Sequence, residues 1–253
     1  MPDVPFTRRA DPIAADPVND AQRLQARVSN VTRGAARAAV LGVNDGLVTN
    51  VCLILALAGA DSSAQQVRIA GLASLIAGAF SMAAGEWISV RSQVELFDGI
   101  VGELEQLAER NPRLLLDELS SSLEDTGLAT DTAHRVAEEL PLDERRFIDF
   151  TARTVFGFDP SEVGSPAIAA VSSLGLFTAG AIVPLAPWFF TSGSTAIAVS
   201  VGATAVASLV VGGWVSRSAG RSSLVGAARQ LGIVIAASLV TYGIGTLFGT
   251  AIA

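Results

Sequence analysis

The sequence predicts an all-α integral membrane protein with five transmembrane helices and an acidic cytosolic helical insert between helices two and three. Half of the 253 residues are hydrophobic and only 16% are charged, whereas soluble domains carry about 25% charged residues. Five apolar segments each contain at least the roughly 20 residues that a helix needs to cross a bilayer. Most of the carboxylates lie together in the single long polar segment between the second and third of these segments.

The five predicted spans are apolar and rich in small residues. The last three contain no Asp, Glu or Arg, as expected of helices that face lipid or neighbouring helices. Glycine and alanine recur in all five, and such residues let transmembrane helices approach closely. The spans are expected at about Ala38–Ala60, Ile69–Val90, Pro166–Phe190, Thr195–Ser216 and Gln230–Ala253.

The arginines predict the orientation, because short cytosolic segments of membrane proteins carry an excess of basic residues. Six arginines precede the first span and seven lie between spans two and three, whereas the first loop holds one and the third loop none. Three more follow span four. The N-terminus is therefore expected in the cytosol and the C-terminus outside.

The N-terminal region, residues 1–33, lacks the apolar core of a secretory signal and is expected to be a disordered cytosolic tail. The rest of the chain divides into 34–91 with two spans, 92–164 with the insert, and 165–253 with three spans. The absence of an organellar targeting segment and the use of Arg without Lys favour a bacterial plasma membrane as the host.

The insert contains seventeen acidic residues and six arginines between Gln93 and Gly164. Breaks at Asn111-Pro112, Gly127 and Pro141 divide it into helices. These are expected at Gln93–Arg110, Arg113–Thr126, Thr130–Leu140 and Leu142–Phe156. Such a segment is either a solvated acidic domain or one that gathers cations.

Two carboxylates, Asp45 and Glu86, are the only acidic residues in the predicted spans. An ionisable group at membrane depth is costly and therefore indicates a function. Spans one and two run in opposite directions, and each carboxylate lies a few residues from the cytosolic end of its span. They are expected at similar depths, where they can face each other.

Met82 lies four residues before Glu86 and so shares its helix face. Carboxylate oxygen together with thioether sulfur suits ferrous iron better than magnesium or calcium, and Asn44 can add an oxygen ligand. Structural roles are the alternative: Met82 as packing, Glu86 reaching the interface, and Asp45 as a hydrogen-bond acceptor between helices.

Two longer motifs extend this interpretation. Leu41–Thr49 (LGVNDGLVT) and Ser81–Val90 (SMAAGEWISV) resemble the signature segments of the vacuolar iron transporter family. The order of parts is similar too, with two spans, an acidic helical insert and three spans opening at Ser165-Pro166. Gly180–Leu185 (GAIVPL) and the glycine-rich last span also resemble that family.

The resemblance implies a homodimeric, proton-coupled exporter of Fe²⁺, and often Mn²⁺, from the cytosol. The membrane-site Asp, Met and Glu of the family fall on Asp45, Met82 and Glu86. A carboxylate that is partly buried suits antiport, because burial favours its neutral form once the metal has left. Expected partners are the bilayer, divalent ions, protons and a second copy of the chain, with no permanently bound cofactor and no nucleic acid.

The insert departs from the family pattern, in which glutamates at helical spacing and a methionine pair collect metal ions. If one residue is inserted before Pro112, Glu103 and Glu118 match two of these glutamates, whereas Gln106 and Leu115 stand where two others are expected. The insert has no methionine. Three further carboxylates, Glu105, Glu109 and Asp117, are expected to attract cations weakly. His134, the single histidine, is expected to be a surface residue.

The incomplete ligand pattern leaves a second hypothesis, a membrane-anchored acidic scaffold that binds a protein partner and whose transport is vestigial. The retention of Asp45, Met82 and Glu86 in one register argues against it, because a scaffold has no need of carboxylates in the membrane. An enzyme is not expected. The sequence has no zinc-protease motif, no phosphate-binding glycine-rich loop followed by Lys, and no nucleophile with a histidine partner.

Overall fold

The computed structural model describes residues 35–140, 144–157 and 164–252, and every regular element in this part of the chain is a helix. The expected N-terminal tail, residues 1–33, lies outside the described residues. Five helices are long and apolar enough to cross a membrane: α2 (Ala35–Gly59), α3 (Ala64–Arg110), α7 (Pro166–Leu185), α8 (Gly193–Ser218) and α9 (Ser223–Ile252). The prediction of five membrane spans is therefore confirmed.

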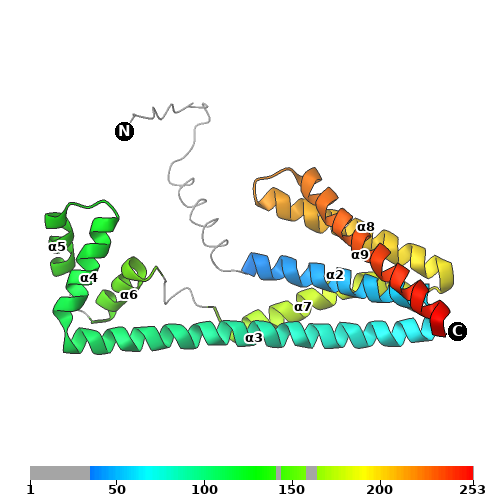
Figure 1. Ribbon diagram of the computed structural model, residues 1–253, viewed down its shortest axis with the longest axis horizontal. Helices are drawn as coiled ribbons and strands as arrows, with labels where there is room; N and C mark the ends of the chain where they lie inside the picture. Colours follow the sequence, from blue (N-terminus) through cyan, green and yellow to red (C-terminus); the bar gives the residue numbers. More distant parts are fainter. Residues whose placement is uncertain (1–34, 141–143, 158–163, 253) are drawn as a thin grey trace, which may run out of the picture.

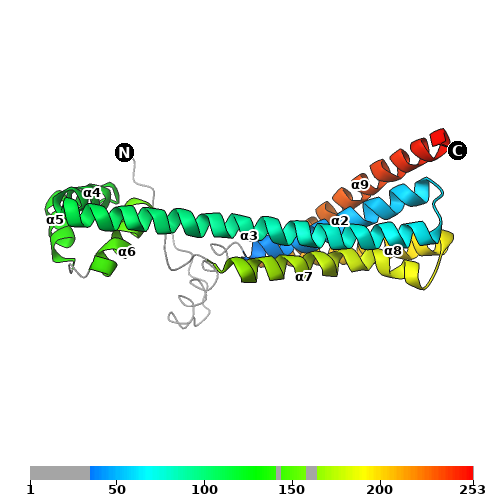
Figure 2. The ribbon, with the colours of Figure 1, turned by 90° about the horizontal axis from the view of Figure 1, so that it is seen from below.

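Helix α3 is the longest element, and it runs the length of the molecule (Figures 1 and 2). Its first half lies in the bundle of α2, α7, α8 and α9, and its other end reaches α4, α5 and α6. It begins at Ala64, five residues before the predicted span, because Ser63 and Gln66 form a capping box. The Ser63 hydroxyl accepts a hydrogen bond from the Gln66 amide, and Gln66 Oε1 accepts one from the Ser63 amide at 2.8 Å.

The structure joins two helices that the sequence analysis separated. Span two and the helix from Gln93 form one continuous α3 of 47 residues. No Gly or Pro interrupts the chain at this junction, and Arg91 Nε pairs with Glu95 Oε1 at 2.7 Å, one turn apart. The helix therefore continues past the apolar segment.

Three shorter helices follow: α4 (Pro112–Asp125), α5 (Thr130–Glu139) and α6 (Glu144–Val155). They agree with the predicted helices to within a few residues. Together with the end of α3 they enclose a hydrophobic core separate from the bundle, made of Leu104, Leu115, Leu119, Leu123, Ala133, Ala137, Phe147, Ile148 and Ala152. Burial of this apolar surface holds the three short helices against α3.

Helix α7 organises the bundle, because α2 and α3 pack mainly against α7 rather than against each other. It ends in the short 3₁₀ helix η2 (Ala186–Phe189), which buries Trp188. Helices α8 and α9 form an antiparallel pair whose α9 also packs along α2. Helix α9 begins at Ser223 rather than near Gln230, so Gln230 lies inside the helix.

Candidate functional site

The turn of α2 that carries Asp45 packs closely against α7. A Cβ atom at Gly46 would collide with the carbonyl oxygen of Phe177 and lie 2.8 Å from the backbone nitrogen of Ala181. In return, a Cβ atom at Gly180 would collide with the carbonyl oxygen of Val43. The two backbones touch because both positions are glycine, and this contact fixes the height of Asp45 along α7.

Helix α3 contacts the same turn of α7. A Cβ atom at Gly78 would collide with the ring of Phe177, which is buried. One turn later, Met82 packs against the buried cluster of Ala79, Phe177 and Ala181. Because Gly46 and Gly78 both meet Phe177, Asp45 lies near the level of Gly78, and Met82 follows one turn further along α3.

Glu86 follows Met82 on the same face of α3 and is half-buried. Asp45 is exposed in the single chain and accepts a hydrogen bond from the Thr49 hydroxyl at 2.9 Å. Within the described part of the chain, neither carboxylate pairs with an arginine. The structure therefore sets the turn that carries Asp45 and the turn that carries Gly78 against the same residue of α7, with Met82 one turn and Glu86 two turns further along α3.

Asn44 is engaged differently from the three other predicted site residues. Its Oδ1 accepts a hydrogen bond from Nε2 of Gln230 on α9, and both side chains are half-buried. Gln230 was not among the predicted site residues, because span five was predicted to begin there. A long amide at membrane depth is itself a signal, since its polar groups need a partner in the bilayer.

The insert residues remain dispersed over the surface. Glu103, Glu105, Glu109, Asp117 and Glu118 are all exposed. Among the described residues, no three His, Cys, Asp or Glu side chains are grouped so that they hold a metal ion. His134 is exposed, and its Nδ1 lies 3.3 Å from the Ser120 hydroxyl.

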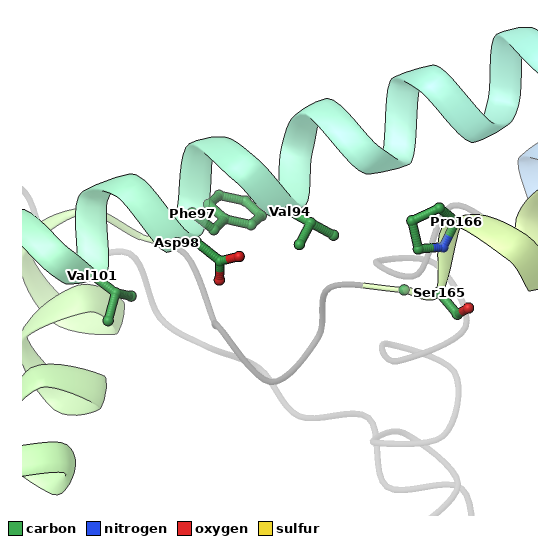
Figure 3. Close-up of a pocket in the computed structure, with 7 residues that line it drawn as sticks. Val94, Phe97, Asp98, Val101, Ser165 and Pro166 are labelled. Carbon is green, nitrogen blue, oxygen red and sulfur yellow. The ribbon is translucent and has the colours of Figure 1, made fainter.

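A shallow pocket lies where α3 passes the start of α7 (Figure 3). Its side chains include one carboxylate, Asp98, among the apolar Val94, Phe97 and Val101. None of the predicted membrane ligands lines it, so the pocket lies apart from the Asp45 region.

The sequence of the chain also matches a known protein family. The family model of the VIT family matches residues 36–246, which include both carboxylates, Met82 and nearly all of the five membrane helices. The chain belongs to the VIT family. The predicted resemblance to vacuolar iron transporters is thereby confirmed.

Individual relatives of this VIT family chain are named as iron transporters. It is 27% identical to vacuolar iron transporter 1 of Oryza sativa subsp. japonica, over 82% of each chain. It is 30% identical to vacuolar iron transporter homolog 2 of Arabidopsis thaliana, over 84% of each chain. With the vacuolar iron transporter of Acanthamoeba castellanii it shares 34% identity, over 61% of this chain and 55% of the relative.

Membership of the VIT family makes this chain a multi-pass membrane protein of a transporter family rather than of an enzyme family. It supports metal-ion transport as the function, with iron the metal in the names of the relatives.

Proposed function

We propose that this chain exports Fe²⁺, and also Mn²⁺, from the cytosol in exchange for protons, with Asp45, Met82 and Glu86 as ligands. The observation that carries the proposal is a pair of carboxylates in apolar helices, each about one helical turn from the level of Met82, the only methionine besides Met1. Neither carboxylate pairs with an arginine among the described residues. A carboxylate at this depth costs free energy unless a cation or a proton neutralises it. Exchange of metal for protons supplies one or the other throughout the cycle.

The exposed face of α2 supports a homodimer as the working unit. Leu41, Asp45 and Thr49 recur every four residues and are all exposed in the single chain. Lipid is a poor solvent for the Asp45 carboxylate, whereas a second α2 in the same position would bring a second carboxylate to the metal. The side-chain oxygen Oδ1 of Asn44 already accepts a hydrogen bond from Gln230, so the proposed ligands are the other three residues.

Ion flux in proteoliposomes tests the proposal. We expect Fe²⁺, kept reduced, and Mn²⁺ to move with an opposing flux of protons read by a pH-sensitive dye. Mg²⁺ and Ca²⁺, which favour sites of oxygen ligands only, should not move. Metal flux without proton movement would exclude antiport, and the absence of Fe²⁺ flux would exclude the export function.

The proposed orientation puts the N-terminus and helices α4–α6 in the cytosol, in a bacterial plasma membrane. Cysteines at the exposed Ser121 on α4 and Ser192 before α8 test it after Cys52 is replaced. In intact bacterial cells an impermeant thiol reagent should label the cysteine at 192 and reach the one at 121 only after lysis. Labelling of both in intact cells would contradict the five-span topology.

The acidic insert, proposed as a cytosolic domain over 92–164, is expected to contribute weakly to transport. Replacing Glu103 and Glu118 together by Ala should lower the initial rate by about twofold or less, because dispersed exposed carboxylates only raise the local cation concentration. The matched control replaces Glu138 and Glu139 on α5, which are also exposed. A loss of transport as complete as that expected of an Asp45 variant would instead show that metal binding by the insert is required for transport.

A further inference from the structure

An interhelical amide pair lies next to the proposed metal site. Gln230 of α9 donates from Nε2 to Oδ1 of Asn44 on α2, across 186 positions of sequence. Both side chains are half-buried in apolar helices. Polar groups at membrane depth are costly unless they are hydrogen-bonded, so each amide depends on the other.

Gln230 is held in place from its other side by α8. A Cβ atom at Gly212 would lie 2.6 Å from both the Cβ atom of Gln230 and the carbonyl oxygen of Gly226. The backbone of α9 is therefore seated against α8 at this point. Gln230 thus joins α8 and α9 to the turn of α2 that carries Asp45.

The two residues that flank Asp45, Asn44 and Gly46, contact different helices on opposite sides of α2. At about 100° per residue, Asn44 and Gly46 lie about 200° apart around α2, with Asp45 between them. Gly46 meets α7 and Asn44 meets α9. Asp45 consequently points along a face of this turn that the described residues leave open, together with Leu41 and Thr49.

The remaining contacts between α2 and α9 do not depend on the amide pair. Val234 packs with Val51 and Leu55, and near the other end of α2 a Cβ atom at Gly249 would contact Ala60. The helices should therefore stay associated without the pair, while the first turns of α2 gain freedom to rotate. A rotation there moves Asp45 directly.

We propose that Gln230 is a positioning residue for the metal site, and that Asn44 acts through this pair rather than as a metal ligand. The inference rests on the proposed function, because it takes Asp45 as a ligand. It identifies α9, which carries none of the proposed ligands, as the element that sets the direction of the Asp45 carboxylate.

The test is a double-mutant cycle measured as the KM for Fe²⁺ in proteoliposomes. Gln230→Leu and Asn44→Leu should each raise KM about tenfold with little change in the maximal rate, since a loosened site binds its ion less well. The double variant should be no worse than either single variant, because both remove the same interaction. The exchange Asn44→Gln with Gln230→Asn restores the pair and should recover most of the lost affinity.

Two controls accompany the cycle. Gln65→Leu makes the same change at an exposed position of α3 and should leave KM unaltered. The double Leu variant contains no unpaired amide and is therefore expected to fold even if a single variant does not. Its KM must still rise about tenfold.

Four results are decisive against a proposal. If the KM of the double variant rises about a hundredfold, the product of the two single increases, Asn44 acts as an independent ligand and the inference is overturned. A lowered melting temperature with unchanged KM would reduce the pair to packing and overturn it as well. If Asp45→Asn carries Fe²⁺ at the wild-type rate in the same vesicles, Asp45 is not a ligand and the proposed site on which the inference rests is wrong, whereas the absence of Fe²⁺ flux in the wild type would refute the proposed function itself.

Discussion

Asp45→Asn and Glu86→Gln are each expected to abolish metal transport without unfolding the protein. The amides keep the volume and hydrogen-bonding ability of the carboxylates, and neither carboxylate pairs with an arginine in the described part of the chain. No ion pair of the fold is therefore broken. What is lost is the negative charge that offsets the desolvation of a divalent cation, together with the group that takes a proton when the metal leaves. The measurement is Fe²⁺ uptake into proteoliposomes, beside the size-exclusion profile of each variant.

Matched controls separate the site from a general effect of charge. Glu95→Gln changes an exposed carboxylate on α3 beyond the proposed site, where its ion pair with Arg91 contributes little. Asp61→Asn does the same in the exposed connection between α2 and α3. Both should transport normally. Folded Asp45→Asn and Glu86→Gln proteins that still carry iron at the wild-type rate would refute the assignment of these carboxylates as the transport site.

Gly46→Ala and Gly180→Ala are expected to destabilise the bundle strongly. In both cases the new methyl group would collide with a backbone carbonyl oxygen, of Phe177 or of Val43. A backbone atom cannot rotate away as a side chain can, so α2 and α7 must separate, at a cost near the upper end of the about 1–3 kcal/mol typical of overpacking. The melting temperature in detergent should fall. The fraction that still folds should transport poorly, because Asp45 is next to the displaced contact.

Gly175→Ala is the matched control on the same helix. No atom of the chain lies within 4 Å of a Cβ atom at this position. Alanine is a better helix former than glycine by roughly 1 kcal/mol, so this variant should be as stable as the wild type or slightly more stable. Equal melting temperatures for the Gly46, Gly180 and Gly175 variants would show that α2 and α7 do not pack through their glycines.

The spans were predictable because their signal is local. Each is a run of apolar residues long enough to cross a bilayer, and its recognition does not depend on the rest of the chain. The ends were less predictable where polar residues continue a helix. Arg91 did not end α3, since it pairs with Glu95 within the helix. Arg229 did not mark the start of α9, since the helix begins at Ser223.

The chemistry of the proposed site was also visible in the sequence, because a carboxylate in an apolar span is costly wherever the helix packs. Asp45, Glu86 and Met82 followed from residue type, depth and helical spacing. Their arrangement did not follow. The expectation that Asp45 and Glu86 face each other left out α7, against which both α2 and α3 mainly pack.

The sequence by itself determined the helical class, the five membrane spans and the residue types of the proposed site, all of which depend on neighbours within a few positions. Only the tertiary structure decided that Phe177 fills the space left by Gly78, that Gly46 and Gly180 bring α2 onto α7, and that Gln230 reaches Asn44. These contacts join residues far apart in the chain. Hydrophobicity specifies that a helix lies in the membrane, but it is nearly the same on all faces of these apolar helices. Which face meets which partner is therefore set by the shape of small residues and by the few polar groups that need a hydrogen bond.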